Sequence, residues 1–194
     1  MSSDEQRPLR SEGALPSGVE VLRAAPEQEP VLANMLELYV YDLSTFVDVH
    51  LRPDGRYHFP QLSQYWQQEN RFPFLVRVDG HLAGFVLVSR GSLISGDPKV
   101  WDMAEFFILR RFRRRGIGAA VAQEIWRRFP GAWDVRVLET NQPAQAFWDA
   151  AISAFTRSRV EAVAAEQGGR RRRVFSFVSA EDEGSRAMDE PPGR

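Results

Sequence analysis

Hydrophobic and polar positions divide the first half of the chain into a strand, a helix and a hairpin. Val19–Arg23 alternates between apolar and polar side chains, which predicts a strand. Over residues 26–43 apolar side chains return every three or four positions, which predicts an amphipathic helix that starts at a proline. Two β-rich runs, 72–78 and 81–88, flank Asp79-Gly80, a pair that favours a type I′ turn, so a β-hairpin is expected.

The second half alternates between strand-like and helix-like patterns. The elements expected here are a strand at 100–109, a helix at 116–129, a strand at 133–138, a helix at 141–152, and a closing hairpin built from 155–165 and 174–178. Strands that alternate with helices, with hairpins toward both ends, predict an α/β fold with a mixed sheet of about seven strands.

The segment 45–70 is the least regular part between these elements. It contains a predicted turn at 52–55, a short helix within 62–68, and five aromatic or imidazole side chains: Tyr57, His58, Phe59, Tyr65 and Trp66. An irregular aromatic insertion is a common place for a substrate pocket, although the same rings can simply cover the edge of the core.

Length and composition limit the class of protein. We expect one domain at 19–179, preceded by a disordered lead-in at 1–18 and followed by an acidic flexible tail at 180–194. A formal charge of -1 argues against general nucleic-acid binding, and zero cysteines exclude disulfides and thiolate chemistry. No apolar run approaches the roughly 18 residues of a membrane span, so we expect a cytoplasmic protein with no membrane partner. We also expect no bound metal.

A candidate phosphate-binding loop follows the strand at 100–109. Arg113-Arg114-Arg115-Gly116-Ile117-Gly118 leads from an apolar strand into a helix rich in small residues. Glycines allow a ligand to approach the backbone, and the first amides of a helix have no internal acceptor, so they can bind a diphosphate. The dinucleotide fingerprint and the Walker loop do not fit, because Val121 replaces the third glycine and Ala119-Ala120 replaces Lys-Ser/Thr.

This loop resembles the Arg/Gln-x-x-Gly-x-Gly/Ala loop of the GNAT superfamily of acetyl-CoA-dependent N-acetyltransferases. A second motif in the expected order, Asn141-Gln142-Pro143-Ala144-Gln145-Ala146-Phe147-Trp148, resembles that superfamily's Asn-x-x-Ala-x-x-Phe-Tyr helix. The resemblance covers about 19–178 and implies a GNAT-type mixed, mainly antiparallel sheet flanked by about four helices. It also implies acetyl-CoA as co-substrate. The residues implied to bind it are Phe106 and Ile108 by backbone pairing with pantetheine, Arg113, Arg114, Arg115, Gly116, Ile117 and Gly118 around the diphosphate, and Asn141 and Phe147 beside the pantetheine.

In such enzymes an amine attacks the thioester directly, so a base must remove a proton from the ammonium. Glu105, an acid within an apolar strand, is our candidate, and an acidic residue on this strand also resembles the polyamine acetyltransferases of the superfamily. Desolvation would raise its pKa toward a useful range. Alternatively, Glu105 has a structural role as a carboxylate bonded to a backbone amide or an arginine. Asp102 is the second candidate base.

Trp148 stands where the family commonly has a tyrosine that protonates the departing thiolate, and an indole N–H is not a useful acid. Water, or a tyrosine from elsewhere, could replace it. The tyrosines considered are Tyr39, Tyr41, Tyr57 and Tyr65.

Three functions remain open from the sequence. The first is an N-acetyltransferase for a primary amine of a small molecule, for which the side chains of Tyr39, Asp42, Asp54, Tyr57 and Trp66 would suit a cationic acceptor. The second is an acyl-CoA-binding protein without turnover. The third is nucleic-acid binding through Arg110–Arg115 and Arg170–Arg173, although the second run is expected to be a solvated cluster near a hairpin tip. The sequence leaves the oligomeric state undetermined, and only the analogy that similar proteins are commonly dimers suggests a homodimer.

Overall fold

A seven-stranded sheet in the order β1-β2-β3-β4-β5-β7-β6 forms the centre of the computed structural model, which describes residues 14–57 and 59–180. The strands are β1 (Val19–Arg23), β2 (Arg71–Val78), β3 (His81–Arg90), β4 (Trp101–Ile108), β5 (Gly131–Leu138), β6 (Val163–Gln167) and β7 (Arg170–Ser179). The helices are α1 (Glu29–Leu43), α2 (Gln64–Gln67), α3 (Ile117–Arg128) and α4 (Gln142–Thr156), with 3-10 turns η1 (Pro26–Gln28) and η2 (Arg110–Phe112). Among the described strands only β4 and β5 pair in parallel, so the mainly antiparallel α/β fold is confirmed.

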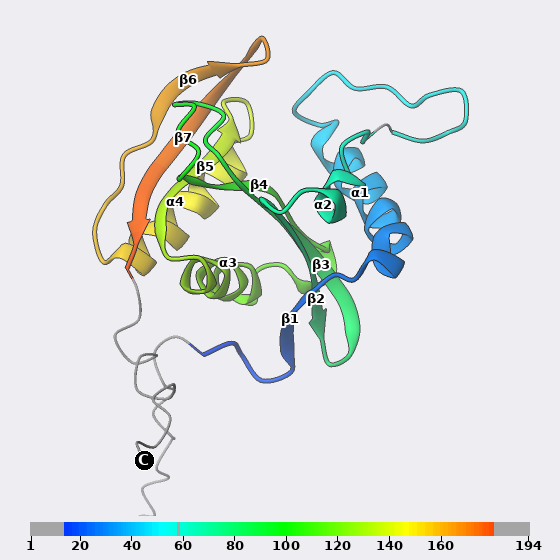
Figure 1. The fold of residues 1–194 in the computed structure, drawn as a ribbon, viewed down its shortest axis with the longest axis horizontal. Coiled ribbons are helices and arrows are strands. Elements are labelled where there is room, and N and C mark those ends of the chain that lie inside the picture. Colours follow the sequence, from blue (N-terminus) through cyan, green and yellow to red (C-terminus); the bar gives the residue numbers. More distant parts are fainter. Residues whose placement is uncertain (1–13, 58, 181–194) are drawn as a thin grey trace, which may run out of the picture.

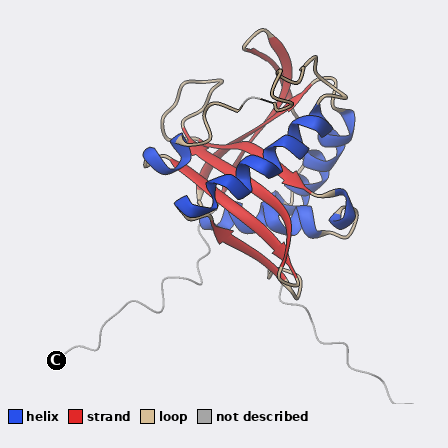
Figure 2. Cartoon of the chain, turned by 90° about the vertical axis from the view of Figure 1, so that its right-hand side faces the viewer, coloured by secondary structure: helices blue, strands red, loops and turns tan. Residues whose placement is uncertain are grey.

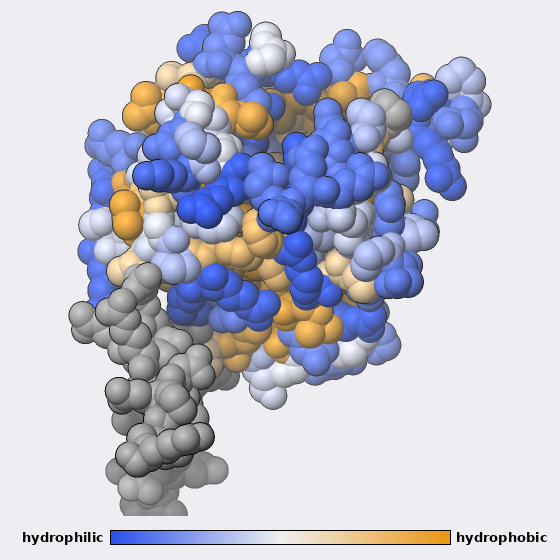
Figure 3. Space-filling view, viewed as in Figure 1, coloured by the Kyte–Doolittle hydropathy of each residue, from blue (hydrophilic) through white to orange (hydrophobic). Residues whose placement is uncertain are grey.

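Helices cover both faces of the sheet (Figure 1, Figure 2). α3 and α4 pack on one face, where Trp126, Trp133 and Phe175 belong to the larger core. α1 and α2 pack on the other face over β2, β3 and β4, where Leu32, Tyr65 and Phe85 belong to a second core. In Figure 3 the visible surface is mainly hydrophilic, with apolar side chains gathered beside α3. The two cores explain why the apolar positions of β2 and β3 run almost without interruption.

The β2–β3 hairpin forms as predicted. Asp79 and Gly80 have φ angles of 50° and 77°, which fits the left-handed pair of residues that a type I′ turn requires. Farther along β3, a Cβ atom on Gly84 would lie 2.2 Å from the carbonyl oxygen of Phe107. Only glycine therefore lets β4 lie this close to β3 at that position.

β4 and β5 diverge soon after they begin. Their parallel ladder joins only Trp101 to Trp133 and Asp102 to Asp134. Beyond these pairs β4 keeps its antiparallel ladder with β3, while β5 pairs with β7 along its whole length. The β5 side of residues 103–108 therefore has no strand partner among the described residues.

A bulge in β4 decides which of its side chains face α1. The ladder pairs Glu105 with Leu87 but Met103 with Val88, so two steps along β4 match one step along β3. Met103 packs in the core under α3 and α4, whereas Glu105 lies on the α1 face with Phe107. In a regular strand Met103 and Glu105 would share one face, so the bulge re-aims the carboxylate.

Three expectations about local structure need correction. α4 continues to Thr156, and the strand expected at 155–165 begins only at Val163. Arg170–Arg173 follows the hairpin turn as the first four residues of β7, where Arg170 and Arg171 are exposed as expected but Arg172 and Arg173 are half-buried. Residues 14–18 of the expected lead-in contact the domain, since Leu15 packs on the core and Gly18 accepts the N–H of Asp79 at 2.8 Å. The rest of that lead-in, the tail at 181–194 and His58 lie outside the described residues. No helix in the described part of the chain is long and apolar enough to cross a bilayer.

Candidate active site

The open side of β4 presents backbone groups at the two predicted positions. The Leu109 N–H donates to the Ala83 carbonyl at 2.8 Å, and the register pairs Phe107 with Phe85. Hydrogen-bonded pairs alternate along an antiparallel ladder, so the N–H and C=O groups of Phe106 and Ile108 point away from β3 toward the divergence from β5. The Ile108 carbonyl already accepts from Arg113 Nε at 2.6 Å. The other groups of these two residues are directed at the gap.

The start of α3 carries free backbone donors. Gly116 precedes the helix with φ at 75°, and the Gly116 carbonyl accepts the N–H of Ala120 at 3.1 Å. The N–H groups of Ile117, Gly118 and Ala119 have no acceptor within residues 14–57 and 59–180. These amides and the helix dipole make this end of α3 suited to an anion.

The arginines around this loop divide into two groups. Arg113 and Arg110 both bind Asp42 of α1, with N–O distances of 2.5 Å and 2.7 Å. Burial alone would raise the pKa of Asp42, but hydrogen bonds from the two guanidinium groups outweigh it and hold that pKa below its ordinary value. The Arg113 side chain therefore ties α1 to the loop. Arg114 and Arg115 are exposed and have no ion pair or hydrogen-bond partner among the described residues.

The two residues predicted at α4 have different structural roles. The Asn141 side chain caps α4 by accepting the Ala144 N–H at 3.1 Å. Phe147 stacks on Phe106 with ring centroids 5.8 Å apart. A Cβ atom on Gly118 would lie 3.3 Å from the Phe147 ring, so glycine allows α3 and α4 to approach here.

Glu105 lies on the α1 face of β4, beside the divergence from β5. Its carboxylate accepts a hydrogen bond from the Tyr39 hydroxyl at 2.5 Å, and the Tyr39 ring is held edge-on by Phe85 and Phe107. Burial raises the pKa of Glu105 from 4.5 to about 7, although the Tyr39 hydrogen bond and the charge of Arg136 both lower it. A carboxyl group with this pKa can exchange a proton near neutral pH.

Asp102 is engaged in a buried ion pair. Its two carboxylate oxygens accept from Arg136 Nε and Nη2 of β5 at 2.8 Å and 2.6 Å, and the Asp102 side chain is 0% exposed. A third guanidinium nitrogen of Arg136 donates to the Gln167 side chain at 2.6 Å. This bidentate pair occupies both oxygens of Asp102, which leaves Glu105 as the carboxylate that no guanidinium group binds within the described residues.

A second cation near Glu105 comes from β7. Arg172 lies opposite Leu138 of β5 and is half-buried. Its Nε atom is buried and has no hydrogen-bond partner in the described residues. Burial and the nearby Arg136 lower the pKa of Arg172, while the negative charge of Glu105 partly offsets them.

Comparisons with known proteins give the family. Residues 35–151, more than half of the chain, match the Acetyltransferase (GNAT) family. The chain belongs to the GNAT acetyltransferase family. No match is found among curated proteins.

Solved structures of other GNAT proteins share the fold. An acetyltransferase from Thermus thermophilus superposes with a TM-score of 0.59 at 13% identity, covering 82% of this chain and 96% of that one. A spermidine N-acetyltransferase from Vibrio cholerae, in complex with CoA and spermine, gives 0.60 at 11% identity, with coverages of 84% and 97%. A Salmonella typhimurium acetyltransferase that modifies the N-terminal serine of ribosomal protein L7/L12 gives 0.54 at 13% identity, with coverages of 86% and 98%. Identities this low relate the folds and not the substrates.

Trp148, at the position where GNAT proteins commonly have tyrosine, is a core residue. It is 6% exposed and packs against Phe106 and Trp126 at ring-centroid distances of 5.0 Å and 6.1 Å. Of the four tyrosines considered as substitutes, Tyr39 lies at Glu105 and Tyr65 is the buried residue of α2. Tyr41 is 62% exposed. Tyr57 is half-buried, and its backbone N–H donates to Glu37 at 2.8 Å.

Residues of the aromatic segment have separate structural contacts. Trp66 donates its indole N–H to the Ala24 carbonyl at 2.9 Å, which explains its position structurally. A cavity of about 220 Å³ lies between α1 and this segment, lined by Glu37, Arg52, Asp54, Tyr57 and neighbouring apolar residues. Of the residues expected to suit a cationic acceptor, Asp54 and Tyr57 line this cavity, while Asp42 is bound by two arginines.

Arg136 and Arg172 of this GNAT chain were not among the predicted site residues. Arg136 had a usable signal, because it is one of two polar side chains, with Asp134, in an alternating apolar strand. Arg172 had none, because the run of four arginines hides which of them points inward. No cluster of three or more potential metal ligands is found within the described residues.

Proposed function

We propose that this GNAT protein is an N-acetyltransferase that moves an acetyl group from acetyl-CoA to a primary amine of a small molecule by direct attack. The observation that carries the proposal is the position of Glu105: an ionisable carboxylate with a pKa of about 7, held by Tyr39 beside the open side of β4. The family supports acetyl transfer, and the spermidine acetyltransferase among the structural neighbours binds an amine.

Donor binding in this proposal uses two sets of backbone groups. Those of Phe106, together with the N–H of Ile108, would pair with the pantetheine arm in the manner of an added strand. The amides at Ile117, Gly118 and Ala119 would hold the diphosphate, with Arg114 and Arg115 adding positive charge. The residues present fit acetyl-CoA, because these donors have no acceptor in the described protein.

The bound donor supplies a thioester, which an uncharged amine can attack. Glu105 removes the proton from the acceptor ammonium, and Tyr39 holds the carboxylate in place for that transfer. Backbone N–H groups on the open side of β4 polarise the thioester carbonyl. Trp148 cannot protonate the departing thiolate, so the proton comes from solvent.

The test is release of the CoA thiol from acetyl-CoA with a panel of amines, on wild type, Glu105→Gln and a control, Glu69→Gln, which lies exposed between α2 and β2. We expect Glu105→Gln to lower kcat/KM at neutral pH by about 10²- to 10⁴-fold and to keep CoA affinity, and Glu69→Gln to match wild type. Activity in Glu105→Gln equal to wild type at every pH would exclude this base.

A second function, acyl-CoA binding without turnover, is favoured by the burial of Trp148 at the usual position of the acid. It predicts that wild type binds acetyl-CoA but releases no thiol with any amine. Calorimetric titration with CoA, run beside the thiol assay, separates the two functions.

A further inference from the structure

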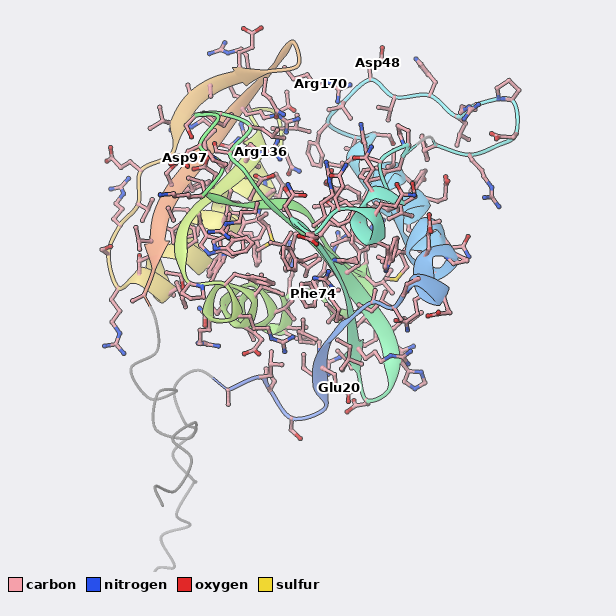
Figure 4. The ribbon with its side chains drawn as sticks, in the orientation of Figure 1. Glu20, Asp48, Phe74, Asp97, Arg136 and Arg170 are labelled. Atoms are coloured by element: carbon pink, nitrogen blue, oxygen red, sulfur yellow. The ribbon has the colours of Figure 1, made fainter. Side chains whose placement is uncertain are left out.

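β5 and β7 present a polar face on the side of the sheet opposite α3 and α4. Trp133 and Val135 of β5 and Phe175 of β7 point into the core beneath those helices. Alternation then directs Arg136 of β5 to the other face, and Arg172 shares that face because the register pairs Leu138 with Arg172 and Arg136 with Val174. In Figure 4 Arg136 lies below the β6–β7 hairpin, whose tip carries Arg170.

The charges on this face do not balance. Both oxygens of Asp102 are taken by Arg136, so that pair is neutral as a unit. Glu105 is held by the Tyr39 hydroxyl and forms no ion pair with Arg172. Arg172 is therefore the cation of this group without a carboxylate partner within residues 14–57 and 59–180.

Leaving Arg172 in this state costs stability. Its Nε atom is buried from solvent and donates to no acceptor in the described part of the chain, and a buried donor without an acceptor loses the hydration that it has in the unfolded chain. A guanidinium group binds a carboxylate through two parallel hydrogen bonds, which would satisfy both the buried N–H and the charge. The feature points to a ligand that brings its own anionic group.

We propose that Arg172 binds a carboxylate of the acceptor, so the acceptor is an amine that carries a carboxylate, such as a free amino acid. This inference rests on the proposed function, because it places the acceptor amine at Glu105. The zwitterion of an amino acid then matches the site: its ammonium faces the carboxylate of Glu105, and its carboxylate faces the guanidinium of Arg172.

The same arrangement disfavours a polyamine. Arg172 carries a positive charge close enough to Glu105 to affect the ionisation of that residue, so it would repel a second ammonium group. One acidic residue expected to suit a cationic acceptor, Asp42, is bound by Arg110 and Arg113. The acceptor of this chain would then differ in charge from spermine, which the Vibrio cholerae enzyme binds.

The experiment measures binding of amines in pairs that differ only in the carboxylate. Each free amino acid, α or ω, is compared with its carboxamide by calorimetric titration in the presence of CoA. The proteins are wild type, Arg172→Gln and a matched control, Arg171→Gln, whose exposed side chain pairs with Glu139 at 3.0 Å on the other face of β7. Thiol release from acetyl-CoA is measured for the same pairs.

We expect wild type and Arg171→Gln to prefer one or more amino acids over their carboxamides by about 10- to 100-fold in Kd, and Arg172→Gln to lose that preference. The affinity for carboxamides should change little in Arg172→Gln, whereas a general loss of folding would weaken the binding of acids and carboxamides alike. Equal affinities for acids and carboxamides in wild type, no binding of either, or a preference retained in Arg172→Gln would overturn the inference. If the preference depends on Arg172 but no thiol is released, the carboxylate site stands and the transferase proposal fails.

Discussion

Removing the Tyr39 hydroxyl tests the electrostatics of Glu105 directly. Tyr39→Phe keeps the ring that packs on Phe85 and Phe107 and deletes only the donor that holds the carboxylate at 2.5 Å. The hydrogen bond lowers the pKa of Glu105, because it stabilises the ionised form against burial. Its loss must therefore raise that pKa.

The size of the change follows from the strength of the bond. A hydrogen bond to a charged group contributes about 1.5 to 3 kcal/mol, and one pKa unit corresponds to about 1.4 kcal/mol. We expect an increase of at least about one unit. From a starting pKa of about 7, the ionised fraction at pH 7 then falls from about one half to about one tenth, which lowers base-catalysed activity about fivefold. Near pH 9 the two proteins should differ by about 10%.

The pKa is measured by NMR titration of the ¹³C-labelled Glu105 carboxyl group, assigned by its absence in Glu105→Gln. The pH profile of kcat/KM provides the kinetic counterpart once an acceptor is identified. Tyr41→Phe, two positions along α1 and exposed, is the control and should leave the titration unchanged. A Glu105 pKa that stays the same or falls in Tyr39→Phe would refute the role of this hydrogen bond in stabilising the carboxylate.

Two further predictions concern Gly118 and the stability effect of Glu105. Gly118→Ala places a methyl group 3.3 Å from the Phe147 ring, so we expect CoA to bind several-fold more weakly in a calorimetric titration. The helix propensity of alanine, worth about 1 kcal/mol, limits any loss of stability. Unchanged CoA affinity would show that this helix contact does not shape the donor site. The folded-state pKa of Glu105 is raised above its unfolded value of 4.5, so its contribution to stability is present below pH 4.5 and is lost as the pH rises through about 7. Urea unfolding should find Glu105→Gln more stable than wild type by up to about 3 kcal/mol at pH 8 and similar to it at pH 4.5, and an equal difference at both pH values would contradict the raised pKa.

Much of the fold could be predicted because local signals agree with it. Asp79-Gly80 predicts the β2–β3 hairpin through its turn chemistry, and the periodicity of α1 and α3 reflects one buried face each. The predicted end of α4 was wrong, because Phe155 suits a strand by its residue type but packs on the core as part of the helix. Apolar pattern alone does not distinguish the two.

The sequence predicted the donor-binding loop more completely than the residues around Glu105. Free amides at the start of α3 follow from local sequence, since glycine and small residues specify that turn. The α1 face of Glu105 depends on a bulge in β4, and the pairing of Asp102 with Arg136 depends on a parallel contact between two strands 34 residues apart. Such features depend on how distant strands align with one another, which a short stretch of sequence does not determine.

The Asp42 ion pairs give α1 a double attachment. Tyr39 and Asp42 lie three positions apart on the helix, so neighbouring turns hold the base and the arginines of the donor loop. After α1 ends, Thr140 of the β5–α4 connection donates to the Phe46 carbonyl at 3.0 Å, which adds a third anchor. A substitution that shifts α1 will therefore change donor affinity and the protonation of Glu105 together. Kinetic constants of α1 variants should accordingly be interpreted as properties of both substrates at once.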